Sequence, residues 1–129
     1  MKANTRLFDI AANLADDRYK LDLQNVLARA KQYGVEKMLF GGTYIKDSQR
    51  SHELSLLDPN YYCTVGIHPC RACQPTVEKK SLEEYFSELE TVIQNCKKGK
   101  LIAIGECGLD YDRFEYADKE SQLKYESKI

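Results

Sequence analysis

The most constraining feature of this sequence is a pattern that recurs about four times: an apolar segment, a glycine or polar residue, then a segment with helical periodicity. The apolar segments predict strands at residues 7–11, 35–40, 61–65 and 101–104. The helical segments are 22–33, 46–57 and 81–98, the last of which begins with the capping-box pattern Ser81–Glu84. Strands that alternate with helices in this way predict a parallel sheet with helical crossovers.

Two architectures have such a sheet: an open, doubly wound sheet and a closed barrel. An open sheet that binds nucleotides often carries a glycine-rich loop after its first strand, whereas residues 11–14 here are Ala-Ala-Asn-Leu. A TIM-type (β/α)8 barrel has eight strands and typically about 250 residues, and the 129 residues of this chain offer about half of that. We therefore predict a single domain over residues 1–129, apparently truncated, that forms the N-terminal half of such a barrel, about four βα units.

Composition and charge limit the classes of function. Hydrophobic residues make up 43% of the chain and charged residues 30%, enough apolar material for a core. A net charge of −1 lacks the basic excess typical of a non-specific nucleic-acid binder. If the substrate is a phosphate polymer, a metal ion must therefore supply much of the local positive charge. The absence of a signal-like or membrane-length apolar run and an odd count of five cysteines predict an intracellular protein, cytoplasmic or nuclear, with reduced thiols and no membrane partner.

Side chains suited to metals or proton transfer follow three of the four predicted strands. In parallel α/β folds the reactive groups gather at these carboxyl ends. The predicted strands are short and mostly apolar, as expected when both faces of the sheet are covered. Glu106, between glycines, directly follows such a buried strand, so it is either a ligand of a divalent cation or the partner of a Lys or Arg. His68 either contacts a phosphate or donates a proton beside the metal, or it packs in its loop and hydrogen-bonds the backbone. Asp9 is either a metal ligand or an acceptor for loop backbone, and Asn13 is favoured as a turn residue.

Other polar residues receive structural interpretations. His68, Cys70 and Cys73 have the spacing H-x-C-x-x-C, but a structural zinc site needs four ligands and no fourth is evident, so loop thiols are favoured. His52 is interpreted as a solvated surface side chain. The tail, residues 110–129, contains scattered aromatic residues; a half-exposed helix and loop is favoured over a surface that stacks on nucleic-acid bases.

Four segments together resemble the TatD family of metal-dependent deoxyribonucleases, in particular its eukaryotic TatD DNase domain-containing branch. They are FDIAANL, GGTYIKDSQ, TVGIHP and IAIGECGLDYDR, in this order and spacing. The resemblance covers roughly residues 7–125, about the first half of a family member. It implies a TIM-barrel hydrolase of the amidohydrolase type that binds one or two divalent ions (Mg, Mn or Zn). The implied activity is hydrolysis of DNA phosphodiester bonds, often as a 3′-to-5′ exonuclease.

The resemblance also assigns roles to single residues. Glu106 resembles a metal ligand of the family, and His68 resembles an active-site residue near the scissile phosphate. Many members carry an H-x-H metal pair after the first strand; this chain has Asp9, Ala11 and Asn13 there, so Asp9 is the candidate for a replacement ligand. The remaining ligands of the family, two histidines and an aspartate, come from later strands. We therefore expect DNA to be the substrate of the complete enzyme, and little or no activity from these 129 residues alone.

Two further hypotheses follow from the same features. A half barrel leaves an edge strand unpaired and part of its inner apolar face uncovered, so the chain could be a non-catalytic, truncated isoform that acts through protein association, including association with itself. Alternatively, the barrel could be an amidohydrolase that acts on a small amide or lactone. The GECGLD segment disfavours that alternative, because it resembles the nuclease branch.

Overall fold

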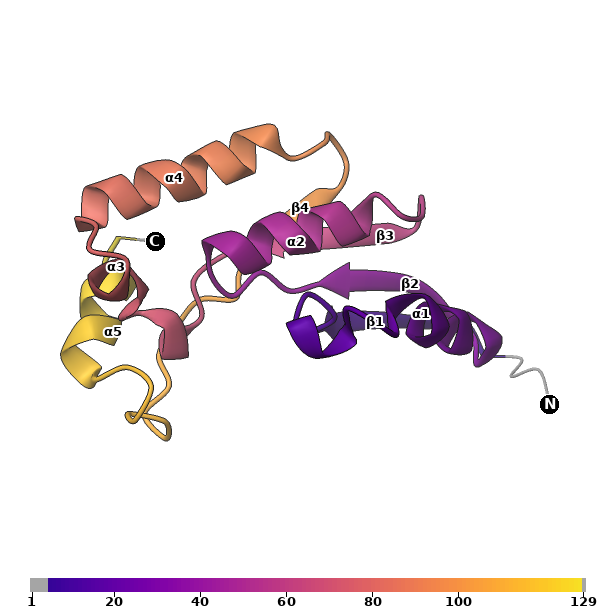
Figure 1. Cartoon of the computed structure of the whole chain (residues 1–129), viewed down its shortest axis with the longest axis horizontal. Coiled ribbons are helices and arrows are strands. Elements are labelled where there is room, and N and C mark those ends of the chain that lie inside the picture. The colour runs from indigo at the N-terminus through magenta and orange to yellow at the C-terminus, as the bar shows by residue number, and fades with distance from the viewer. Residues whose placement is uncertain (1–4, 129) are drawn as a thin grey trace.

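A computed structural model describes residues 5–128 and consists of one four-stranded sheet with helices packed on it (Figure 1). The strands are β1 (Leu7–Ala12), β2 (Val35–Phe40), β3 (Tyr61–Val65) and β4 (Leu101–Ile104). The helices are η1 (Asp17–Tyr19), α1 (Leu23–Gln32), α2 (Ile45–Ser55), η2 (Pro69–Arg71), α3 (Gln74–Val77), α4 (Leu82–Asn95) and α5 (Lys119–Glu126). The predicted strands and long helices are all present, and their ends differ from the prediction by at most three residues.

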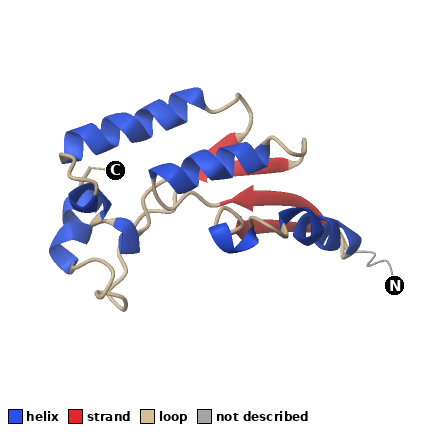
Figure 2. Ribbon diagram, in the orientation of Figure 1, coloured by secondary structure: helices blue, strands red, loops and turns tan. Residues whose placement is uncertain are grey.

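The four strands pair in sequential order, β1-β2-β3-β4, and every pair is parallel. Helical crossovers connect them, as Figure 2 shows. This arrangement confirms the prediction of a partial TIM-type barrel. All four carboxyl ends therefore lie along one edge of the sheet, which is where the predicted site residues were expected.

The core has two parts, one at each end of the chain. In the first, Phe40 and Tyr61 are in edge-to-face contact, with ring centroids 5.5 Å apart, and α1 contributes Leu23 and Leu27. In the second, Tyr85 of α4 packs against Tyr125 of α5, so the tail is anchored by one face of its helix. The rest of the tail is largely exposed, which agrees with the half-exposed helix and loop predicted for it.

Capping explains where α4 begins. Ser81 Oγ accepts a hydrogen bond from Glu84 N, and Glu84 Oε2 accepts one from Ser81 N, which is the capping box predicted from sequence. At the other end, His52 Nε2 accepts a hydrogen bond from Lys97 N at 2.9 Å. His52 is half-buried and ties α2 to the α4–β4 turn, so the interpretation of His52 as a solvated side chain was wrong.

The edge strands expose much of their apolar surface. Five large side chains of β1 and β4 are between 44% and 69% exposed: Leu7, Phe8, Ile10, Ile102 and Ile104. The apolar strand sequences suggested that both faces of the sheet are covered. Within residues 5–128 this is wrong for β1 and β4, because each has a neighbouring strand on one side only.

Replacing Asp58 with Asn should lower the stability of the fold in a pH-dependent way. Asp58 Oδ2 accepts a hydrogen bond from Lys31 Nζ at 2.6 Å and Oδ1 accepts one from Asn60 N. Lys31 first, then the Asn60 amide, hold the pKa of the Asp58 carboxyl below its usual value. A lowered folded-state pKa stabilises the fold above the unfolded pKa of about 3.9, and that contribution disappears as the pH falls through the folded pKa.

We expect Asp58→Asn to lower the free energy of unfolding by about 0.5–1 kcal/mol at pH 7, since Lys31 is half exposed to solvent. In urea unfolding measured at a series of pH values, the difference from the unchanged chain should shrink as the pH falls from 5 to about 3. Glu36→Gln, which removes the more exposed Arg6–Glu36 pair, is the control and should change little. A difference that stays constant over this pH range would contradict the prediction.

Candidate metal site and phosphate-binding groove

A groove with a volume of about 1180 Å³ lies at the carboxyl ends of the strands. Its lining includes one residue from the loop after each strand: Asn13 after β1, Thr43 after β2, His68 after β3 and Glu106 after β4. Two of the three predicted site residues, His68 and Glu106, are therefore brought into one groove. The third, Asp9, is not among the residues that line it.

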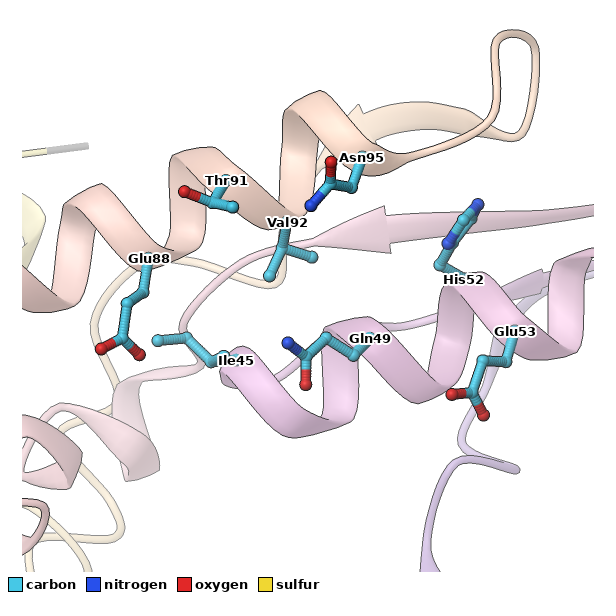
Figure 3. Close-up of a pocket in the computed structure, with 8 residues that line it drawn as sticks. All are labelled: Ile45, Gln49, His52, Glu53, Glu88, Thr91, Val92 and Asn95. Atoms are coloured by element: carbon cyan, nitrogen blue, oxygen red, sulfur yellow. The ribbon is translucent and has the colours of Figure 1, made fainter.

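A smaller cavity of about 410 Å³ lies elsewhere, between α2 and α4. Figure 3 shows Gln49 and His52 of α2 on one side and Thr91, Val92 and Asn95 of α4 on the other. It contains none of the residues predicted for the site. We interpret it as the gap between two loosely packed helices.

Backbone hydrogen bonds connect the strand-end loops that form the groove. His68 N donates to Thr43 O, and Glu106 N donates to Gly42 O, each at 2.9 Å. Gly66, the first residue after β3, has no room for a side chain. A Cβ there would lie 2.3 Å from Gly105 C and 2.4 Å from Glu106 O. The Glu106 loop therefore crosses directly over the end of β3, and only glycine at position 66 permits this approach.

Glu106 and Asn13 face a small space beside Gly41. A Cβ on Gly41 would lie 3.3 Å from Glu106 Oε1 and 3.6 Å from Asn13 Oδ1. Glycine thus leaves open a cradle that two side-chain oxygens border. Oxygen ligands suit Mg²⁺ and Mn²⁺, and carboxylates also bind Zn²⁺, so the residues present fit a divalent ion, with Glu106 and Asn13 as the side chains that would hold it.

Glu106 is more exposed to solvent than the sequence predicted. We expected a carboxylate at the end of a buried strand, and Glu106 is exposed, because β4 is an edge of the sheet in this chain. The alternative, a pair with Lys or Arg, is also absent: within residues 5–128 no basic side chain lies within 4.0 Å of the Glu106 carboxylate. The carboxylate is free to bind an ion, but burial does not require one.

Asp9 lies inside β1 and is exposed. Its Oδ1 accepts a hydrogen bond from Ala11 N at 3.1 Å, which is the loop-backbone alternative considered for it. Asn13, which we favoured as a turn residue, occupies the groove instead. The H-x-H comparison pointed to this region of the chain, but the sequence held no signal to rank Asn13 above Asp9.

His68 is the N-cap residue of η2. Its Nδ1 accepts a hydrogen bond from Cys70 N at 3.1 Å. The side chain is partly buried and lines the groove. This hydrogen bond to loop backbone is the structural alternative considered for His68, and the position of the side chain in the groove also agrees with the functional one.

The cysteines do not form the H-x-C-x-x-C cluster. Cys73 Sγ donates to Tyr116 O at 3.2 Å, as expected of a loop thiol. Asp110 approaches Cys70 instead: the Cys70 thiol donates to Asp110 Oδ2 at 3.8 Å, and potential ligand atoms of His68, Cys70 and Asp110 all lie within 4.8 Å of one another. No sequence spacing links Asp110 to the other two, because this contact depends on the tertiary fold.

In the cluster of His68, Cys70 and Asp110, neighbouring groups already stabilise the negative charge of Asp110. The Asp112 amide, and then Arg113 at 2.7 Å from Oδ2, hold the pKa of Asp110 below its usual value. Burial raises the pKa of the Cys70 thiol, so this thiol keeps its proton at neutral pH. The cluster is therefore satisfied without an ion.

Six basic side chains line the groove, and three of them are held by carboxylates: Arg18 by Asp16, Arg50 by Glu53 and Arg113 by Asp110. The other three have no ion-pair partner within the described part of the chain: Lys20, Lys46 and Arg71. Arg71 lies over the ring of Tyr44, with Cζ 4.8 Å from the ring centroid. Three carboxylates that line the groove also lack an ion-pair partner in the described part of the chain: Asp17, Asp47 and Glu106. The groove as a whole has no excess of positive charge, and Lys20, Lys46 and Arg71 are the cations that remain available to an anionic ligand.

Comparison with known proteins identifies relatives over nearly the whole chain. Residues 8–127 match the family described as TatD related DNase. The chain is 35% identical to "Deoxyribonuclease Tat-D" of Schizosaccharomyces pombe, over 93% of this chain and 42% of that protein. It is 32% identical to "3'-5' ssDNA/RNA exonuclease TatD" of Pantoea vagans, over 95% and 44%.

The fold has a counterpart among solved structures. A crystal structure of YJJV, a TatD homologue from Escherichia coli K12, superposes with a TM-score of 0.71 over 95% of this chain and 44% of that chain, at 23% identity. The chain thus spans less than half the length of the relatives it matches. No helix among residues 5–128 is long and apolar enough to cross a membrane. From the family match over residues 8–127, the chain belongs to the TatD related DNase family.

Proposed function

We propose that this chain supplies the first part of a metal-dependent deoxyribonuclease of the TatD type, which hydrolyses phosphodiester bonds of DNA. The observation that carries the proposal is the convergence of Glu106, Asn13 and His68 from three strand ends on one groove with unpaired cations. The names of the two relatives described above, a deoxyribonuclease and an exonuclease, favour this function over hydrolysis of a small amide or lactone.

Each residue has a stated part in the proposed reaction. Glu106, with Asn13 beside it, would hold a divalent ion. Asp9 remains the proposed replacement ligand, although it does not line the groove and its Oδ1 accepts from Ala11 N. Such an ion would supply a Lewis acid for the phosphate and for a water nucleophile. His68 contacts the phosphate, and Lys20, Lys46 and Arg71 attract the backbone of the nucleic acid. We also propose an intracellular location, cytoplasmic or nuclear.

The proposal includes an expectation for the 129-residue chain by itself. Among the described residues, the groove offers only Glu106 and Asn13 as oxygen donors at the Gly41 cradle. A two-metal phosphodiesterase site needs more ligands than these to hold two ions about 4 Å apart. We therefore expect binding of nucleic acid by the chain, and little or no turnover.

Replacing Arg71 with Ala should weaken binding of a single-stranded DNA oligonucleotide. We expect the affinity, measured by fluorescence anisotropy at low ionic strength, to fall about three- to tenfold, because one phosphate contact is lost. The slope of log K against log salt concentration should also decrease by about 0.7. Arg6→Ala is the matched control, since Arg6 lies at the opposite end of β1 and pairs with Glu36.

Two results would count against the proposed function in this experiment. The first is the absence of any salt-dependent binding to the oligonucleotide. The second is an equal loss of affinity in Arg71→Ala and Arg6→Ala, because binding would then not depend on the groove.

A second candidate function is association with another protein, including a second copy of this chain. The observation that favours it is the exposed apolar surface of β1 and β4, where Ile10 is 69% and Ile104 is 53% exposed. Each of these strands also has one edge without a pairing partner among the described residues. Exposed apolar strands at a sheet edge favour association.

The double substitution Ile10→Lys and Ile104→Lys should shift the chain toward the monomer. We expect the unchanged chain to have an average mass above that of a monomer in light scattering, rising with concentration, and the variant to lose most of that rise. Leu21→Lys is the control, because Leu21 is fully exposed outside the sheet. A compact monomer at every concentration would contradict self-association.

A further inference from the structure

The two ring nitrogens of His68 differ in their hydrogen bonding. Nδ1 accepts the hydrogen bond from the Cys70 main-chain N–H at 3.1 Å. No hydrogen bond joins Nε2 to any partner in the part of the chain that the structure describes, although the side chain lines the groove. One nitrogen is therefore occupied by the protein, and the other is left for a ligand.

The hydrogen bond to Nδ1 decides where the ring proton lies. A nitrogen that accepts a hydrogen bond carries a lone pair, so in the neutral imidazole the proton is on the other nitrogen. His68 is thus fixed as the tautomer that donates through Nε2. In this form Nε2 cannot also bind a metal ion, because its lone pair is used in its bond to hydrogen.

This reasoning also decides between two interpretations of the His68–Cys70–Asp110 cluster. A metal ion there would need either Nδ1, at the expense of the Cys70 hydrogen bond, or an unprotonated Nε2. It would also compete with Arg113 for Asp110 and with the proton for the Cys70 thiol. The hydrogen-bonded arrangement satisfies Nδ1 of His68, Asp110 and the Cys70 thiol at once, and leaves Nε2 of His68 for a ligand.

We propose that the main-chain N–H of Cys70 is a positioning group that holds His68 as the Nε2–H tautomer, so that His68 donates a hydrogen bond to a phosphate oxygen in the groove. The phosphate part of this inference rests on the proposed function; the tautomer does not. A neutral imidazole donates a hydrogen bond but is a poor proton donor, so this tautomer favours the phosphate contact over proton donation. The loop-packing alternative explains the hydrogen bond at Nδ1 and leaves Nε2 unused. Cys70 acts through His68 and not on the substrate.

The other histidine of the chain, His52, should have the opposite tautomer. His52 accepts a hydrogen bond from Lys97 N through Nε2, so it should carry its proton on Nδ1. The chain has only these two histidines. One spectrum of the ring nitrogens can therefore compare them directly.

The test is a long-range ¹H–¹⁵N spectrum of the ¹⁵N-labelled chain at about pH 8.5, two units above the ordinary pKa of histidine of about 6.5. We expect a protonated Nε2 and an unprotonated Nδ1 for His68, and the reverse for His52. Cys70→Ala keeps the main-chain N–H and should leave the His68 pattern unchanged. A proton on Nδ1 of His68, or a change in Cys70→Ala, would overturn the proposal.

Two substitutions of His68 separate the cap from the donor. Asn places an acceptor near the position of Nδ1 and keeps the cap, whereas Gln places a donor near the position of Nε2. We expect His68→Asn to keep the urea midpoint and to lose about fivefold to tenfold in affinity for single-stranded DNA. His68→Gln should lower the midpoint and keep most of the affinity. The opposite assignment of effects would contradict the proposal.

The two proposals can fail separately. If His68 shows the expected tautomer and the chain does not bind DNA, the proposed function is wrong and the positioning by Cys70 stands. If Arg71→Ala weakens DNA binding and His68 carries its proton on Nδ1, the proposed function stands and the positioning is wrong.

Discussion

Gly66→Ala should strongly destabilise the fold. The added methyl group would lie 2.3 Å from Gly105 C, 2.4 Å from Glu106 O and 2.6 Å from Gly105 O. All three atoms belong to the backbone, so no side chain can rotate away to make room. The Glu106 loop must move, and the hydrogen bonds from Gly105 N to Val65 O and from Glu106 N to Gly42 O are then strained or lost.

We expect this substitution to lower the free energy of unfolding by about 3 kcal/mol, at the upper end of the cost of overpacking. That is a large part of the 5–15 kcal/mol that stabilises a typical domain. Urea unfolding followed by circular dichroism measures the change. The Glu106 loop should be affected first, because the clash lies at its base.

Gly41→Ala is the matched control for Gly66→Ala. Both glycines follow a strand and lie at the carboxyl edge of the sheet. The nearest atom to a Cβ at position 41 is Glu106 Oε1 at 3.3 Å, the end of a flexible side chain that can move by a few tenths of an ångström. We expect less than about 1 kcal/mol of destabilisation. Equal midpoints for the two variants would show that the loop does not cross β3 as described.

The fold could be predicted from the sequence because its determinants are local. Apolar segments of strand length, the positive φ of Gly34 just after α1 and the Ser81–Glu84 capping box each act within a few residues. The rule that parallel strands end at a common edge then placed His68 and Glu106 in one groove. The segments GIHP and IGECGLD resemble one nuclease family. That resemblance agreed with the predicted fold and with the predicted groove, and the family match confirmed it.

The parts that could not be predicted depend on contacts between distant segments. Asn13 Oδ1 and Glu106 Oε1 meet beside Gly41, and no sequence pattern connects these three positions. Asp110 joins Cys70, and Lys97 binds His52, through the same kind of tertiary contact. The exposure of Glu106 was mispredicted because a strand sequence does not reveal whether the strand is internal or at an edge.

Glu106→Gln should lower the affinity of the chain for Mn²⁺ by tenfold or more. The substitution keeps the size of the side chain and removes the negative charge that attracts the ion. A tenfold change corresponds to about 1.4 kcal/mol, which is modest for a charged ligand at a divalent ion. Water proton relaxation measures Mn²⁺ binding directly and does not require nuclease activity.

Two further variants define the site around Glu106. Gly41→Ala places a methyl group in the cradle between Glu106 Oε1 and Asn13 Oδ1, so it should weaken Mn²⁺ binding while the fold remains intact. Asp9→Asn keeps an acceptor for Ala11 N and removes only the charge, so it tests the proposed ligand role of Asp9 by itself. A loss of affinity in Asp9→Asn supports that role, and an unchanged affinity removes Asp9 from the ligand set. Unchanged Mn²⁺ binding in both Glu106→Gln and Gly41→Ala would exclude the cradle as the metal site, because the two variants alter its charge and its space independently.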